Sequence, residues 1–141
     1  MRFHVALLSI GLWGCAHLSG GGPSADIKAA ADEFHKRARW RDFIGVSELV
    51  VSEKREAFED ARRIGEDDRD LTITDYEVLD VRAAPDGDSG RVVSRVQWLR
   101  LPSPTERTAQ VRTELVKREG AWFVKSQDDG PFVAVLRPDD G

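Results

Sequence analysis

The stretch that decides the fold is residues 91–127, RVVSRVQWLRLPSPTERTAQVRTELVKREGAWFVKSQ. It divides into three segments of alternating apolar and polar residues, separated at Ser103 and Pro104 and again at Glu119 and Gly120. Side chains on a β-strand have a period of two, so three consecutive antiparallel strands place these apolar residues on one face. The expected inner face carries Val92, Val96, Trp98, Ala109, Val111, Leu115, Trp122 and Val124, with a hydroxyl row from Ser94, Thr113 and Ser126. We therefore predict an antiparallel sheet with one buried face.

The opposite face of this sheet is expected to be mostly polar. Its polar members are Arg91, Arg95, Gln97, Gln110, Arg112, Glu114, Lys125 and Gln127. Apolar side chains among such charges are typical of a protein–protein interface, although single apolar residues are also common on free surfaces. The side chains that we expect to form an interface here are Arg95, Leu99, Arg112, Val116 and Phe123.

The register of the strands follows from matching apolar residues with apolar residues. The expected partners are Trp98 with Ala109 and Val96 with Val111 in the first hairpin, and Leu115 with Val124 and Glu114 with Lys125 in the second. The second set implies a two-residue turn at Glu119 and Gly120. A three-residue loop with Gly120 at positive φ would shift the pairing by one residue. The apolar pattern favours the two-residue turn.

Two further segments have weaker patterns. Residues 71–83 are rich in β-formers, but their apolar residues fall on both faces, and a β-bulge near residues 75–77 would reconcile them. Residues 85–90 (PDGDSG) form a turn by composition. Residues 132–136 are expected to add a short strand or to cover an edge of the sheet, and residues 137–141 to form a tail.

Three amphipathic helices are expected before the strands. The first begins at Ser24 or Asp26, and its apolar residues follow helical spacing: Ile27, Ala31, Phe34 and Ala38. Asp42 opens a shorter second helix, and Ser52 caps a third, which ends at Gly65. Residues 66–70 (EDDRD) are expected to form an acidic loop. Helices followed by strands indicate an α+β fold with the helices on one face of the sheet.

This order of elements resembles the nuclear transport factor 2-like family, also called cystatin-like. Residues 116–126 (VKREGAWFVKS) are similar to the final hairpin of that family. The resemblance implies a cone in which a curved antiparallel sheet of about four strands wraps the first helix, here over residues 25–136. It also implies that an enzyme of this type works inside the mouth of the cone, that the cone is often open, and that the outer sheet face often forms dimers.

The first residues of the chain have the form of an export signal. Residues 1–14 combine a basic start at Arg2, an apolar run over residues 5–12 and a small residue before Cys15. Residues 12–15 (LWGC) resemble the lipobox of bacterial lipoproteins, with Trp13 as a departure from the usual small residue. The resemblance implies that Cys15 is lipidated and becomes the mature N-terminus, with residues 15–24 as a flexible tether. Ala16 then favours the outer membrane, facing the periplasm.

Composition limits the remaining possibilities. The chain has 141 residues, enough for one domain. Its net charge is −4, from 21 basic and 25 acidic residues that are intermixed, which argues against nucleic acid as a partner because phosphate binding requires a basic stripe. Cys15 is the single cysteine, which excludes an internal disulfide and a thiolate metal cluster.

Candidate catalytic groups are few. Two of the three histidines fall in the signal and the tether, which leaves His35, expected at the edge of the first helix. Tyr76 with Asp75, Glu77 or Asp80 could form a proton donor and a base. Alternating polar residues that face solvent are the simpler interpretation of this segment.

The aromatic residues and the acidic segments remain as candidate binding groups. The side chains that could line an apolar pocket, or else fill the core, are Phe34, Phe43, Phe58, Tyr76, Trp98 and Trp122, with Trp40 as a further aromatic residue. Residues 66–70 and the pair Asp86 and Asp88 lack the spacing of a calcium loop, so solvated turns are expected. We expect neither a metal nor a cofactor.

The sequence thus indicates a membrane-anchored envelope lipoprotein with a non-catalytic binding domain. Its partners would be the membrane, through the lipid, and a second copy or another envelope protein, through the outer sheet face. Two alternatives remain: an isomerase- or hydratase-like enzyme with a pocket in the cone, and a structural protein that associates with itself.

Overall fold

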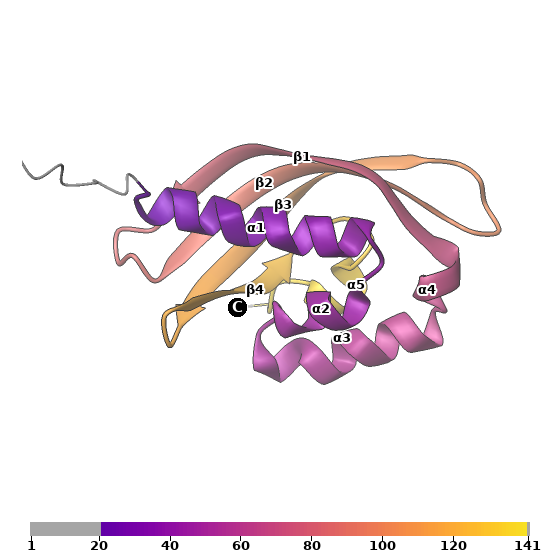
Figure 1. Cartoon of the computed structure of the whole chain (residues 1–141), viewed down its shortest axis with the longest axis horizontal. Coiled ribbons are helices and arrows are strands. Elements are labelled where there is room, and N and C mark those ends of the chain that lie inside the picture. Colours follow the sequence, from indigo (N-terminus) through magenta and orange to yellow (C-terminus); the bar gives the residue numbers. More distant parts are fainter. Residues whose placement is uncertain (1–20, 141) are drawn as a thin grey trace, which may run out of the picture.

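Helices precede strands along the chain, and the helices cover one face of the sheet (Figure 1). The computed structural model describes residues 21–140. The helices are α1 (Pro23–Arg39), α2 (Phe43–Glu48), α3 (Ser52–Ile64), α4 (Asp67–Asp70) and α5 (Val133–Leu136), and the strands are β1 (Leu71–Ala83), β2 (Ser89–Arg100), β3 (Arg107–Arg118) and β4 (Ala121–Gln127). The sheet is antiparallel in the order β1-β2-β3-β4 and curls over α1 (Figure 1). The predicted α+β class, with about four strands, is confirmed.

The described residues begin after the predicted signal. Residues 1–14, Cys15 and most of the tether lie outside them, so the predictions on export and lipidation are not addressed by the structure. Within residues 21–140, no helix is both long enough and apolar enough to cross a membrane.

Helix α1 presents the predicted apolar stripe to the sheet. Ile27, Ala31, Phe34 and Ala38 are all buried. The helix begins at Pro23 rather than at Ser24 or Asp26, because the fixed φ of proline suits the first helical position. Its stripe contributes most of the apolar side chains that cover β1 and β2.

The other helices follow the predicted signals as far as residue 65. Asp42 caps α2 by accepting a hydrogen bond from the Gly45 amide at 2.9 Å, and Gly65 is the C-cap of α3. The expected acidic loop is wrong, however. Its residues form α4, and the Asp67 side chain is buried instead of solvated.

Two bulges in β1 explain its mixed apolar pattern. The register with β2 shifts at Thr74 and again at Leu79. Each bulge inserts one residue, so Ile73, Tyr76 and Val81 all reach the inner face although their spacing is irregular. A bulge was predicted near residues 75–77. The strand has two bulges, one before these residues and one after them.

The predicted register of the first long hairpin is wrong by two residues. Val96 pairs with Ala109, and Trp98 pairs with Arg107. The apolar pattern does not distinguish these registers, because a shift of two leaves every side chain on its own face. The longer connection between Arg100 and Arg107 sets the pairing.

The second hairpin has the predicted two-residue turn. Glu119 and Gly120 have φ of 51° and 80°, which is the combination of a type I′ turn, and Leu115 pairs with Val124 as expected. A bulge at Lys125 then changes the end of β4. Lys125 therefore does not pair with Glu114.

The bulge at Lys125 also exchanges two side chains between the faces of the sheet. Ser126 lies opposite the outer-face residue Glu114, although its side chain is buried, whereas Gln127 lies opposite Thr113 on the inner side. The Gln127 amide donates a hydrogen bond from Nε2 to Thr113 Oγ1 at 3.1 Å and is buried. The sequence interpretation had placed these two residues the other way round.

The C-terminal segment folds inward as a helix rather than as a strand. The free edge of β4 is already occupied by the segment before α3, because the Val51 amide donates to Val124 O at 3.0 Å and the Val124 amide to Leu49 O at 2.7 Å. Phe132 and Leu136 instead enter the core beside α3. Of the two alternatives expected for residues 132–136, the short strand is thus wrong.

Candidate functional site

The interior of the cone is filled by aromatic side chains around Phe132. The ring of Phe132 lies 5.9 Å from Phe34, 6.3 Å from Phe43 and 5.3 Å from Phe58, measured between ring centroids. The Arg62 guanidinium lies against two of these rings, 4.8 Å from the Phe58 centroid and 4.7 Å from that of Phe132. Phe132 was not among the pocket candidates, because a short apolar segment near the C-terminus shows no helical or strand period.

The six predicted pocket residues do not surround a common hollow. Phe34, Phe43 and Phe58 are buried in the cluster just described, and Trp98 is buried on β2. Tyr76 and Trp122 are half-buried on β1 and β4. The seventh aromatic residue, Trp40, is 78% exposed at the end of α1. A void of about 10 Å³ lies within the cone, between α1, the inner sheet face and Phe132.

His35 lies inside the cone and not at the edge of its helix, which corrects the prediction. Its side chain is buried, stacked on Tyr76 with ring centroids 5.2 Å apart and in edge contact with Phe34 at 5.6 Å. Burial lowers the pKa of His35 to about 4, against a weaker opposite effect of the Asp32 charge. The imidazole is therefore neutral at neutral pH.

Tyr76 lies beside His35 but is not joined by the carboxylates proposed as its partners. Burial raises the pKa of Tyr76, and its hydroxyl donates to the Asp32 carbonyl oxygen at 3.5 Å. The three carboxylates lie on the other side of β1, where they pair with arginines: Asp75 with Arg39, Glu77 with Arg95 and Asp80 with Arg82. The described part of the cone therefore brings together a neutral histidine and a tyrosine.

A buried ion cluster joins the helices to the sheet at the far end of α3. Asp67 forms an ion pair with Arg62, whose Nε lies 2.8 Å from Asp67 Oδ2, and Asp67 also contacts Arg100 of β2. Asp67 is 1% exposed, and burial lowers the pKa of Arg62. Arg62 lies five residues before Asp67, outside residues 66–70, and Arg100 lies 33 residues after it, so residues 66–70 alone gave no signal for this cluster. Across residues 21–140, no group of three or more acidic, histidine or cysteine side chains could hold a metal.

The predicted interface residues all belong to the outer face, but they fall into separate parts of it. Val116 and Phe123 are direct cross-strand partners and are half-buried. Arg95 pairs with Glu77, and Arg112 Nη1 lies 3.7 Å from Asp128. Leu99 lies ten residues along β2 from Ser89, the partner of Val116, which is roughly 30 Å in an extended strand. Val116 and Phe123 are thus the only apolar members of the set that adjoin each other.

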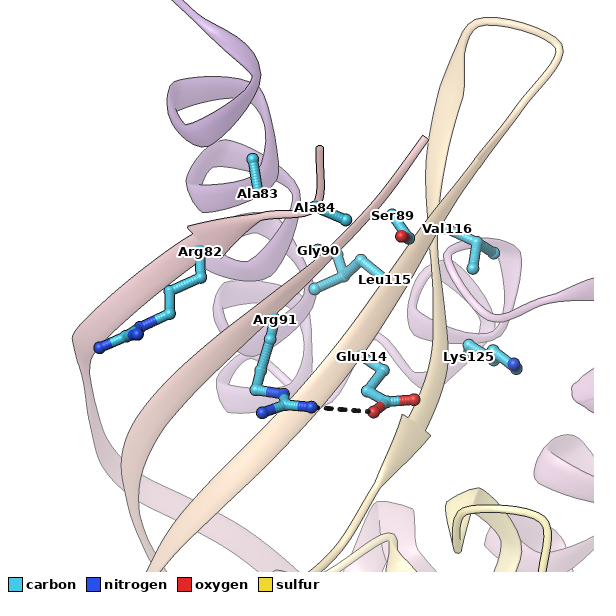
Figure 2. Close-up of a pocket in the computed structure, with 10 residues that line it drawn as sticks. All are labelled: Arg82, Ala83, Ala84, Ser89, Gly90, Arg91, Glu114, Leu115, Val116 and Lys125. Carbon is cyan, nitrogen blue, oxygen red and sulfur yellow. Dashed lines mark ion pairs between the residues drawn. The ribbon is translucent and has the colours of Figure 1, made fainter. Parts of the chain in front are cut away.

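A hollow of about 360 Å³ lies next to Val116 on the outer face (Figure 2). Its lining crosses all four strands, with Arg82 on β1, Arg91 on β2, Glu114 on β3 and Lys125 on β4. Arg91 Nη2 lies 3.7 Å from Glu114 Oε1, and Figure 2 shows the Glu114 carboxylate between Arg91 and Lys125. Ser89 and Val116 form an uncharged part of the wall of this hollow. The hollow can accept a side chain from a partner and offers both signs of charge to it.

Comparisons with known proteins show the fold and no closer relationship. No family model and no curated protein matches the chain. The solved structure of a SEC-C motif containing protein from Rhodopseudomonas palustris is similar with a TM-score of 0.60 at 16% identity, over 78% of this chain and 82% of that one. An NTF-2 like protein of unknown function from Shewanella oneidensis is similar with a TM-score of 0.58 at 13% identity, over 74% and 96%.

A third structure has a related description. A ketosteroid isomerase-like protein from Erwinia carotovora is similar with a TM-score of 0.53 at 16% identity, over 72% of this chain and 89% of that one. These likenesses confirm the α+β cone of the nuclear transport factor 2-like type. At such identities they carry no activity or ligand to this chain.

Proposed function

We propose that the chain is a membrane-anchored, non-catalytic binding domain of the bacterial envelope, which works through the outer face of its sheet. The observation that carries this proposal is the contrast between an interior closed around Phe132 and an outer face with a 360 Å³ hollow lined in part by Val116, the cross-strand partner of Phe123. A buried, neutral His35, with Asp75 and Glu77 turned away from Tyr76 and paired with arginines, supports a role other than proton transfer.

The first partner that fits this face is a second copy of the chain. Two-fold symmetric interfaces are self-complementary, so they need both signs of charge on one surface. The outer face has them in cross-strand pairs: Arg91 with Glu114, Arg95 with Glu77 and Arg112 with Asp128. Such exposed pairs have low individual stability and can exchange with those of a second copy.

Sedimentation velocity on the full chain tests the interface. We expect concentration-dependent association that Phe123→Asp weakens by about 30-fold or more, because a charge would replace an apolar contact at the centre of the interface. The matched control is Ile64→Asp, the same kind of change at a side chain that is 78% exposed on α3, and it should associate like the wild type. Association that survives Phe123→Asp, or that is lost with Ile64→Asp, contradicts the proposal.

The anchor is tested separately. We propose that Cys15 carries the lipid, as its place at the end of the signal-like segment indicates. Metabolic labelling with an alkyne fatty acid should mark the wild type and leave Cys15→Ser unmarked. Label that remains on Cys15→Ser contradicts lipidation at this residue and leaves the proposal for the outer face intact.

A further inference from the structure

The void inside the cone has two polar side chains among its otherwise apolar walls. It is lined by His35 and Ala38 of α1, Ile73 of β1, Val96 and Val111 of the sheet, and by Gln127, Pro131 and Phe132 of the C-terminal part. His35 is 3% exposed and Gln127 is 1% exposed, so neither reaches solvent.

Each of these two side chains has one polar atom without a protein partner. His35 Nε2 and Gln127 Oε1 are buried and make no hydrogen bond to any atom of residues 21–140. The other end of the Gln127 amide is fixed, because its Nε2 donates to Thr113 Oγ1. Buried polar groups in folded proteins nearly always have a partner, either protein or ordered water. Two such atoms at one void therefore indicate a bound molecule between them.

The size of the void decides what that molecule is. A cavity needs about 10–15 Å³ of this kind of volume to hold one water molecule, and this one has about 10 Å³. A substrate-sized molecule needs roughly 300 Å³ or more. Water can donate to the amide oxygen and can also accept from, or donate to, a neutral imidazole nitrogen.

We propose that the cone binds one internal water molecule, which bridges Gln127 Oε1 and His35 Nε2. This site goes beyond the proposed function, because it lies inside the cone and not on the outer face. The water links α1 to the end of β4 and gives the buried histidine the hydrogen bond that its surroundings lack. The site selects a molecule that is small and can form hydrogen bonds, and it discriminates against apolar gas atoms of similar size.

Oxygen-17 magnetic relaxation dispersion on the full chain counts long-lived internal waters and tests the proposal. We expect Gln127→Met, which keeps the length of the side chain and removes the acceptor, to have one long-lived water fewer than the wild type. The matched control is Gln110→Met, the same change at an exposed glutamine of β3 that does not line the void, and this variant should keep the wild-type count. Equal counts in wild type and Gln127→Met overturn the proposal.

A second measurement needs only the wild-type chain and covers the case in which Gln127→Met does not fold. Nuclear Overhauser contacts between water and the methyl groups of Val96 and Val111, which line the void, are recorded. We expect water cross-peaks at these methyl groups, because a bound water lies within a few ångströms of the atoms that line so small a void. The absence of water cross-peaks at both methyl groups shows a dry void and overturns the proposal.

Discussion

The inner and outer faces of the sheet come from the same alternating strands, yet they are stabilised by different contacts. On the inner side, α1 and α5 exclude water, and Phe132 contacts three other aromatic rings. On the outer side, the contacts are ion pairs between side chains that are about half exposed, such as Arg95 with Glu77. Buried packing contributes several kcal/mol per large side chain, while exposed ion pairs contribute about 0–1 kcal/mol. The packing on the inner face therefore contributes most of the stability, and the ion pairs of the outer face contribute little.

The largest effect is expected at the centre of the inner side. Phe132→Ala should lower the free energy of unfolding by about 3–5 kcal/mol, because it leaves a cavity among three rings and removes a contact of Arg62. Urea unfolding followed by circular dichroism measures this. Trp40→Ala, at a side chain that is 78% exposed, is the control and should change stability by less than about 0.5 kcal/mol. Similar losses in both variants would mean that Phe132 does not fill the cone.

The next effect belongs to the buried ion cluster. Asp67→Asn should cost about 3 kcal/mol, at the lower end of the range for breaking a buried pair, because asparagine keeps one acceptor oxygen but leaves Arg62 without a counter-charge. Asp68→Asn, one residue away at an exposed position, should be neutral within about 0.5 kcal/mol. Chemical denaturation of the two variants side by side measures the difference. A neutral Asp67→Asn would show that the cluster is dispensable.

These two predictions concern features that the sequence could not show. The alternation of apolar and polar residues predicted the inner face of the sheet and the two-residue turn at Glu119 and Gly120, because both are local signals. It could not fix the register of β2 and β3, since a shift of two residues preserves parity. The bulge at Lys125 was missed for a different reason: one inserted residue reverses the parity of the residues after it, and alternation alone does not show where such a residue is inserted.

The burial of the residues in the candidate site was harder to predict, because it depends on contacts between segments that are separate in the sequence. Asp67 is buried by arginines that lie before and after it in the chain, and His35 is buried because bulges in β1 bring Tyr76 to the inner face. Neither arrangement has a local pattern. The outer-face residues were easier to predict, because strand parity alone places Val116 and Phe123 on the face opposite the buried side chains.

A third, smaller effect follows from the pKa of His35. Its folded pKa of about 4 lies below the ordinary value of 6.5, so the unfolded state binds more protons between these values and stability falls as the pH falls through this window. Between pH 8 and pH 5, the wild type should lose about 2 kcal/mol more than His35→Leu, which does not titrate there. Unfolding curves at several pH values measure this. Parallel curves would contradict the burial of a neutral imidazole, and an NMR titration of the His35 ring checks the pKa directly in the wild type.

The smallest effect is expected on the outer face. Arg95→Gln breaks the pair with Glu77, and since both side chains are about half exposed, the free energy of unfolding should change by less than about 1 kcal/mol. The same denaturation assay measures it, and 1 M salt should remove most of any difference. A loss comparable to that of Asp67→Asn would show that the outer face is part of the stabilising framework.

We propose that the cone is closed to small molecules and that binding belongs to the outer face. An NMR titration of the full wild-type chain with indole, followed at the methyl groups of Val96 and Val111 inside the cone, tests it most directly. We predict no saturable shift in the wild type and a saturable shift in Phe132→Ala, where the missing ring leaves room for the probe. Saturable shifts of these methyl groups in the wild type would contradict the claim.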